Sequence, residues 1–461
     1  MSDAPDKTSK DWQAMEDYWR TVNDFLAGAQ VVRDAGERYL PKFPNETKKD
    51  YDFRVKTGKF TNVYLDIVEG LSQKPFSKEL TIAEGAPERL ASLIEDIDGR
   101  GNHLHVFAAQ TFFAGINKAI DWILVDYTRA AGLRTVQQER EAGVRPYWVH
   151  VPADKVIRVE SKVIAGREQL TLVHILESPD RVRIYKRDGS AVTWEVHAKN
   201  ESGEWVLDDD GVITIGVIPL VPFITGRRKG ATWQFEPAMR GAVDLQRELY
   251  QEETSLKYIK TMTCFPMLAG NGVPADVDAD GKPKSIPVGP KAVLYAPPGP
   301  DGSHGEWKWI GTDAASLTFL AEQIKETKRD LREIGKQPLT AQSGNLTVIA
   351  TAFASAKGNS AVQAWALGLK DALENALKLT SLWLAETYEP EVVIHTDFGI
   401  ENGDDKAPEY LLKMRKSAPG DEPDISQRTL WDEFKRRGIL SAEFDPDIEI
   451  DERLFESLDE L

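Results

Sequence analysis

The spacing of hydrophobic residues divides the chain into helical and strand-like regions. Near the N-terminus, apolar side chains recur every three or four residues, as they do on the buried face of a helix. Two such stripes are Trp12, Met15, Trp19, Val22 and Leu26, and Phe60, Val63, Ile67 and Leu71. A third helix is expected after Asn102, leading to an apolar strand over residues 123–127.

Residues 145–226 carry a strand pattern instead. Short runs rich in β-branched and aromatic residues alternate with turn pairs such as Asp188-Gly189 and Asp210-Gly211. The expected strands are 147–151, 156–160, 170–176, 181–186, 192–197, 205–207 and 212–215. This order predicts an antiparallel meander that ends at Pro219 and Pro222.

The second half of the chain returns to long helices. The pattern predicts charged helices over 236–261 and 313–336, separated by a segment rich in proline and glycine with short strand-like pieces. The longest helix is expected from about Ser360 to the residue before Pro390, followed by a strand over 392–396. One short helix, 429–437, is expected in the C-terminal region.

A long neutral segment connects the last two long helices. Residues 337–369 contain one charged side chain, Lys357, where the composition of the chain predicts about nine. Polar and small residues interrupt the segment, so it is not apolar enough to span a membrane. A neutral loop between charged helices is a candidate for a surface that meets a polyanion without holding it.

Composition limits the classes of function. At 461 residues the chain exceeds one ordinary core, and its single cysteine, Cys264, excludes an internal disulfide and a cysteine-ligated metal cluster. The net charge of −17, of which −9 falls in residues 401–461, does not suit a freely diffusing protein that clamps nucleic acid. Neither a secretory signal nor a membrane span is visible.

No motif indicates catalysis. The phosphate-binding pattern Gly-x-x-x-x-Gly-Lys-Ser/Thr and the nucleophile pattern Gly-x-Ser-x-Gly are both absent. His103 and His105 are two residues apart and so do not share a helix face, which favours ordinary side chains over metal ligands. The run 208–211, Asp-Asp-Asp-Gly, lacks the spacing of a calcium loop and is interpreted as a hairpin turn. We therefore expect no enzyme activity, no cofactor and no metal site.

Basic residues on the helix over 313–336 allow two interpretations. Lys325, Lys328, Arg329, Arg332 and Lys336 could form a basic stripe facing a channel. They could instead pair with the acidic residues of the same helix, which the sequence spacing favours.

The order of these elements resembles the portal protein of tailed double-stranded-DNA bacteriophages, the head-to-tail connector portal. Local sequence also resembles one branch of that family. The matching pieces are Glu37-Arg38-Tyr39-Leu40-Pro41, the segment 51–76 that ends Gly70-Leu71-Ser72-Gln73-Lys74-Pro75-Phe76, residues 244–250 leading to Pro266, and Ile425-Ser426-Gln427-Arg428-Thr429. The resemblance covers nearly the whole chain.

The resemblance implies an α+β, portal-type fold. Its parts are a wing of helices and an antiparallel β meander (1–232), stem helix 1 (233–262), a small β-containing clip (263–311), stem helix 2 (312–336), a tunnel loop (337–357), the wing's long helix and strand (358–400), and a small helical crown (401–461). The tunnel-loop side chains expected to line the DNA channel are Gln342, Ser343, Asn345, Thr347, Thr351, Ser355 and Lys357.

The resemblance also implies a function. Portal proteins form a homo-oligomeric ring, usually of twelve subunits, at one capsid vertex of the virion. Terminase packages double-stranded DNA through the ring, and the DNA later leaves through it into the tail. The implied partners are the DNA, the major capsid protein, terminase and a head-tail adaptor protein, with no membrane, and assembly takes place in the host cytoplasm. The alternatives are a capsid-associated or scaffold protein without a DNA channel, and a nuclease of the packaging machinery. A nuclease would need a carboxylate metal cluster near the channel, and residues 337–369 contain no Asp or Glu.

Overall fold

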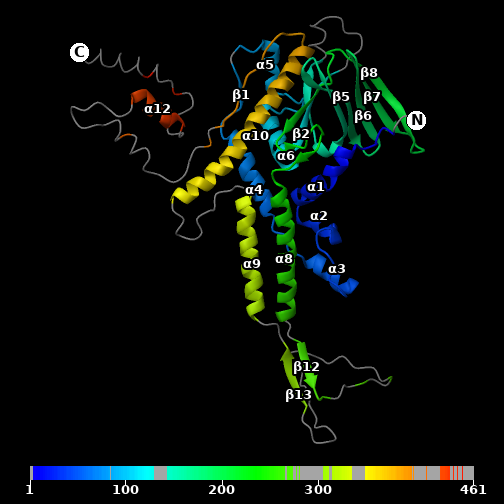
Figure 1. Ribbon diagram of the computed structural model, residues 1–461, viewed down its shortest axis with the longest axis vertical. Helices are drawn as coiled ribbons and strands as arrows, with labels where there is room; N and C mark the ends of the chain where they lie inside the picture. Colours follow the sequence, from blue (N-terminus) through cyan, green and yellow to red (C-terminus); the bar gives the residue numbers. More distant parts are fainter. Residues whose placement is uncertain are drawn as a thin grey trace, which may run out of the picture.

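The molecule is elongated, with a broad body, a pair of long helices and a small β hairpin at the far end (Figure 1). The computed structural model describes residues 4–83, 85–128, 143–264, 267–273, 305–310, 314–334, 348–396 and 426–436, with isolated positions 277, 280, 398, 412, 440, 444 and 449. Helices and antiparallel sheets both contribute to the body, which confirms the predicted α+β class.

Six helices from the N-terminal part of the chain contribute to the body. They are α1 (Lys10–Ala27), α2 (Ala29–Asp34), α3 (Lys48–Thr57), α4 (Val63–Ser72), α5 (Glu88–Ile94) and α6 (Leu104–Lys118). The side chains of Ser9, Thr47 and Asn62 accept hydrogen bonds from backbone N–H groups in the first turns of α1, α3 and α4. Most residues of the two predicted apolar stripes are buried, namely Met15, Trp19 and Val22 in α1 and Val63, Ile67 and Leu71 in α4, whereas Trp12, Leu26 and Phe60 are half-buried.

A three-stranded sheet forms the centre of the body. Strand β2 (Ile120–Tyr127) lies between β3 (Pro146–Val151) and β9 (Leu220–Ile224), and both pairings are antiparallel. The first six residues of β2 are buried, because α6 and α10 (Val348–Trp383) both pack against it. Strand β1 (Thr81–Ile82) pairs with β14 (Val392–Val393). This pairing joins the segment that follows α10 to the segment between α4 and α5.

The predicted meander forms a separate five-stranded antiparallel sheet in sequence order. Its strands are β4 (Val156–Ile164), β5 (Arg167–Ser178), β6 (Arg181–Asp188), β7 (Ala191–Lys199) and β8 (Trp205–Ile213). Figure 1 shows this sheet at the margin of the body, beside the N-terminal residues.

One turn predicted in the meander is wrong. Asp210-Gly211 lies inside β8, where the sequence suggested two strands separated by a hairpin turn. Gly211 pairs with Trp194, and a Cβ at this position would lie 2.7 Å from the Trp194 ring. The glycine therefore makes room for a cross-strand tryptophan, and a register shift at Val196/His197 accommodates the rest of the strand.

The longest helix also differs from its prediction. Helix α10 begins at Val348 and ends at Trp383, so residues 348–357 are helical rather than part of a loop. Four of these ten residues are alanine, the strongest helix former, but a neutral segment offers no polar face from which a helix could be predicted.

A bidentate ion pair joins β5 to β10 (Arg227–Arg228). The Arg228 guanidinium donates to both oxygens of Glu168, at 2.7 and 2.8 Å, and the Ser161 hydroxyl donates to one of them. These hydrogen bonds, chiefly those from Arg228, lower the pKa of Glu168 to about 2.

We predict that this carboxyl contributes to stability only where it is ionised. Its contribution should be complete above about pH 4.5 and lost as the pH falls towards 2, because the folded protein holds the lower pKa. Urea unfolding at pH 5 should show Glu168→Gln less stable than wild type, and the gap should narrow at pH 3 and close as the pH approaches 2. Glu201→Gln, in the turn between β7 and β8, is the control and should follow wild type. A gap that stays constant over this range would contradict the prediction.

Candidate functional site

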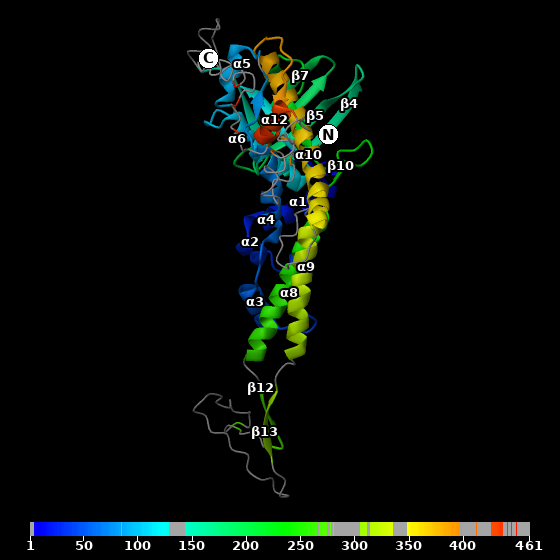
Figure 2. The ribbon, with the colours of Figure 1, turned by 90° about the vertical axis from the view of Figure 1, so that its left-hand side faces the viewer.

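Two long helices lie side by side in antiparallel orientation and extend from the body. Helix α8 (Arg240–Cys264) runs away from the body and α9 (Ala314–Ile334) returns to it, as both views show (Figures 1 and 2). The predicted helices over 236–261 and 313–336 are therefore confirmed. At the far end, β12 (Met267–Asn271) pairs antiparallel with β13 (Glu306–Ile310).

One buried carboxylate ties the helix pair to the body. Glu253 of α8 accepts hydrogen bonds from Lys328 Nζ of α9 at 2.7 Å and from Thr61 Oγ1 at 2.9 Å and Thr61 N at 3.1 Å. Lys59 Nζ lies 3.2 Å from the same carboxylate. Burial raises the pKa of Glu253, but the bonds from Lys328 and Thr61 outweigh it, so the pKa is lowered.

The basic residues of α9 do not act as one group. Lys328 is committed to Glu253 and half-buried, whereas Arg329 is exposed and pairs locally with Glu326 at 3.0 Å and Asp330 at 3.4 Å. Lys325 is exposed and Arg332 half-buried, and neither forms an ion pair with another described residue. Lys336 lies outside the described residues. Pairing within the helix therefore applies to Arg329, whereas Lys328 pairs with an acidic residue of another helix.

The neutral segment begins α10. Gln342, Ser343, Asn345 and Thr347 lie outside the described residues, while Thr351, Ser355 and Lys357 lie in the first three turns of the helix. Thr351 and Ser355 are four residues apart and share a helix face. In Figure 1 these turns project past the body end of α9, away from the sheets.

The rest of α10 anchors this projection. From Val362 onward its buried positions follow a regular helical stripe over the central sheet: Val362, Trp365, Ala366, Leu369, Ala372, Leu373, Ala376, Leu377 and Thr380. The helix is thus firmly held at its C-terminal end, and its neutral N-terminal turns extend from that support.

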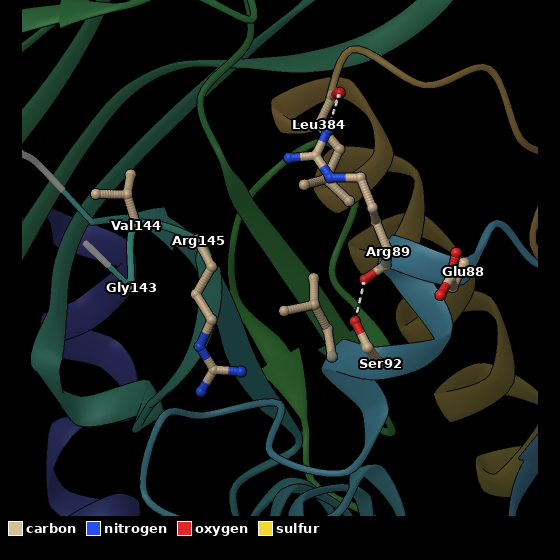
Figure 3. A pocket seen from close by; sticks show the side chains of 8 residues that line it. Glu88, Arg89, Ser92, Gly143, Val144, Arg145 and Leu384 are labelled. Atoms are coloured by element: carbon tan, nitrogen blue, oxygen red, sulfur yellow. Dashed lines mark hydrogen bonds between the residues drawn. The ribbon is translucent and has the colours of Figure 1, made fainter. Parts of the chain in front are cut away.

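Two pockets lined by described residues of the body carry no catalytic arrangement. The pocket in Figure 3 has a volume of about 330 Å³ and lies between α5, the end of α10 and the start of β3. Arg89 donates to the Leu384 carbonyl at 3.4 Å, and the Ser92 hydroxyl donates to the Arg89 carbonyl at 2.9 Å. The hydroxyl is thus engaged by its own helix and is not aligned with a base. A more polar pocket of about 600 Å³ holds Arg145 and Arg183, each already paired with an aspartate.

The two histidines considered as metal ligands in the sequence analysis accept hydrogen bonds from backbone N–H groups. His103 caps α6, its Nδ1 accepting from His105 N at 3.1 Å, and His105 Nδ1 accepts from Leu80 N at 3.0 Å. Among the described residues, no three His, Cys, Asp or Glu side chains are grouped as metal ligands. Within the same part of the chain, every helix is too short or too polar to cross a bilayer.

Sequence reasoning missed an acidic stripe on α8. Asp244 and Glu248 are exposed, Glu252 is half-buried, and the three follow one another at intervals of four residues. Their spacing was a usable signal, since residues four apart share a helix face.

Comparison with known proteins gives one family match and a set of similar structures. Residues 239–384 match the family described as "Domain of unknown function (DUF4055)", a region that spans α8, β12, β13, α9 and α10. No curated protein matches the chain.

Three of the similar structures are assemblies of gene transfer agent particles. A chain in the neck of the native particle, computed with C12 symmetry, is 13% identical with a TM-score of 0.42, covering 89% of this chain and 96% of that one. A chain in the neck of the empty particle, computed with C6 symmetry, is 12% identical with a TM-score of 0.41 and covers 73% and 82%. A chain in the native virion is 12% identical with a TM-score of 0.40 and covers 90% and 95%.

Proposed function

We propose that this chain is a portal subunit, which forms a ring at one capsid vertex through which double-stranded DNA is packaged and later ejected. The observation that carries the proposal is the placement of one neutral helical arm where a two-helix stalk meets a broad body. Sequence resemblance to portal proteins supplies the expectation, and this geometry supports it.

The stalk suits a position along the axis of a ring. Helices α8 and α9 extend away from the body side by side as an antiparallel pair, with the paired strands β12 and β13 at the far end (Figure 2). Copies arranged around an axis would place their stalks as a narrow tube below a wider ring of bodies. In this arrangement the hairpin would face whatever protein meets the narrow end, which for a portal is terminase and then the adaptor.

The neutral arm suits contact with moving DNA. Over residues 337–369 the side chains offer only Lys357 to phosphate groups, so the duplex would release few counterions on contact and would rebind few on departure. A summed charge of about −200 for twelve copies would repel phosphates from the remaining surfaces. We therefore infer that residues 342–356 line the narrowest part of the channel.

Electron microscopy of the purified protein tests the proposal. We expect closed rings, about twelve-fold, with an open axial channel and with residues 342–356 at its narrowest point. Shells, dimers or single molecules at every concentration would overturn the proposal. Rings that carried this segment on the outer rim would overturn its role in the channel.

A further inference from the structure

Helix α3 presents a basic outer face that carries an exposed aromatic ring. Lys49, Phe53 and Lys56 are spaced by four and three residues, so they share one face of the helix. The opposite face, with Tyr51 and Arg54, is buried against the rest of the chain. Phe53 is 48% exposed, and neither lysine forms an ion pair with another described residue. This basic face of α3 is therefore accessible in the isolated chain, whose net charge is −17.

Helix α9 presents an acidic outer face that also carries an exposed aromatic ring. Phe319, Glu322 and Glu326 are spaced by three and four residues and lie opposite the buried Ile324. Phe319 is 68% exposed, and both glutamates are exposed. Glu322 forms no ion pair with another described residue. The pair of Glu326 with Arg329 is solvent-exposed and so contributes little to holding either side chain.

The two faces are complementary in composition and in length. The basic face of α3 has two lysines and a phenylalanine, and the acidic face of α9 has two glutamates and a phenylalanine. Each face extends over about 10 Å of helix. Exposed aromatic rings are characteristic of the residues that anchor protein interfaces. A contact between the faces would bury both rings and pair their charges.

The borders of the two faces carry the opposite charges. Lys325 and Arg329 flank the acidic face of α9, and Asp52 flanks the basic face of α3. A shift of one helix along or around the other would bring like charges together. The pattern therefore favours one relative position of the two helices.

Both faces lie in the half of the helix pair that points away from the body. Lys328 of α9 meets Glu253 near the middle of α8, and the acidic face of α9 lies beyond this contact. Figure 1 shows α3 beside the same half of α8. Copies standing side by side would therefore bring the two faces to the same height.

The two faces lie on opposite sides of the helix pair. Helix α8 separates α3 from α9 in both views, so the faces cannot meet within one chain (Figures 1 and 2). A contact between two different surfaces of identical chains is heterologous, and when its rotation closes it generates a ring. A second copy of this chain is therefore the occupant that fits both faces at once.

We propose that the basic face of α3 binds the acidic face of α9 of a second copy of this chain. The lysines pair with the glutamates, and both phenylalanine rings become buried in the seam between the two copies. This inference rests on the proposed ring, and it assigns the outer face of α9 to the seam between subunits. The complementary charges fix the height and orientation of each copy, which is their common role at an interface.

Charge reversal tests the seam. The double variants Lys49→Glu/Lys56→Glu and Glu322→Lys/Glu326→Lys should each lower the fraction of protein in rings by about tenfold or more, because each sets like charges against each other at every seam. Light scattering and electron microscopy at fixed protein concentration measure this fraction.

A matched control separates the seam from the effect of net charge. Lys162→Glu/Lys186→Glu makes the same change of charge as the α3 variant, at exposed positions of the five-stranded sheet, and should assemble like wild type. Thermal melting of all three variants as monomers should match wild type, because every altered side chain is exposed.

Mixing the two reversed variants gives the decisive result. In an alternating ring, the reversed face of α3 meets the reversed face of α9, and the next seam joins two wild-type faces. Every seam is then attractive, so equal amounts of the two variants should form rings although neither does so alone. A pairing confined to one chain cannot be restored in this way.

Phe319→Ser tests the apolar part of the seam. The variant should need a protein concentration about tenfold higher for half-maximal ring formation, because its ring no longer removes apolar surface from water at each contact. Leu367→Ser, an exposed position on α10, is the control and should assemble like wild type. Assembly of Phe319→Ser at the wild-type concentration would mean that the ring stays uncovered and would contradict the seam.

The outcomes separate the two proposals. Wild-type rings with a channel, together with reversed variants that assemble normally or fail to complement each other, would overturn the seam and leave the portal function intact. The two faces would then belong to contacts with a different protein. A wild-type protein that never forms rings would overturn the proposed function, and the seam with it.

Discussion

Replacing Trp148 with alanine is expected to destabilise the body by about 4 kcal/mol, the range measured when a buried tryptophan is removed. Trp148 is 1% exposed on β3, and its indole packs against Phe107 with ring centroids 5.6 Å apart. Its Nε1 donates to Thr380 Oγ1 of α10 at 2.9 Å. The substitution therefore removes core volume and one of the polar contacts that hold the long helix on the central sheet.

Urea unfolding followed by circular dichroism measures this loss. Thr380→Val should cost about 1–2 kcal/mol, since it keeps the volume but leaves the indole N–H without its acceptor. Val163→Ala, at a position 75% exposed, should change stability by less than about 0.5 kcal/mol. If Trp148→Ala unfolded at the wild-type urea concentration, the packing of α10 on this sheet would be wrong.

Glu253→Ala is expected to cost about 3 kcal/mol, because several charge-assisted hydrogen bonds in a buried setting are lost together. The change leaves Thr61 without its acceptor and releases Lys328 and Lys59, whose side chains are 26% and 57% exposed and can reach water. The loss should concentrate where α8 meets the body.

Hydrogen exchange locates the effect of this second change. Amide protection in α8 and α9 should fall more than protection in the five-stranded sheet, because the lost contacts join the helices to the loop before α4. Glu322→Gln, an exposed carboxyl on α9, serves as the control and should leave both regions unchanged. Uniform loss of protection over the whole body would argue against a local tie.

Elements with strong alternation of apolar and charged positions could be predicted from the sequence. Helices α8 and α9 were predicted to within four residues at each end, because charged residues mark their outer faces. Most strands of the meander were predicted for the same reason, since apolar and polar residues alternate along them.

The failures have local physical causes. The start of α10 could not be predicted because alanine, threonine and serine give a helix no polar face to recognise. Asp-Gly is a common turn sequence, but Gly211 lies within a strand because the ring of Trp194 on the neighbouring strand leaves no room for a Cβ there. Sequence spacing does not reveal this contact.

The candidate site shows the same limit. The basic residues of α9 were found from their spacing, but the partner of Lys328 is Glu253, 75 residues away in sequence. The choice among Glu322, Glu326 and Glu253 depends on how two helices align, and that alignment is set by packing rather than by pattern.

Strand β8 carries a consequence for the behaviour of the protein at high concentration. It is an edge strand, and no described strand pairs with its outer side, so a strand from another molecule could add there. Asp208, Asp209 and Asp210 are exposed along this edge, and joining two copies here would set one acidic run against the other. Repulsion between the two acidic runs opposes edge-to-edge aggregation through β8. At high concentration the protein should therefore stay soluble and remain available to associate through other surfaces.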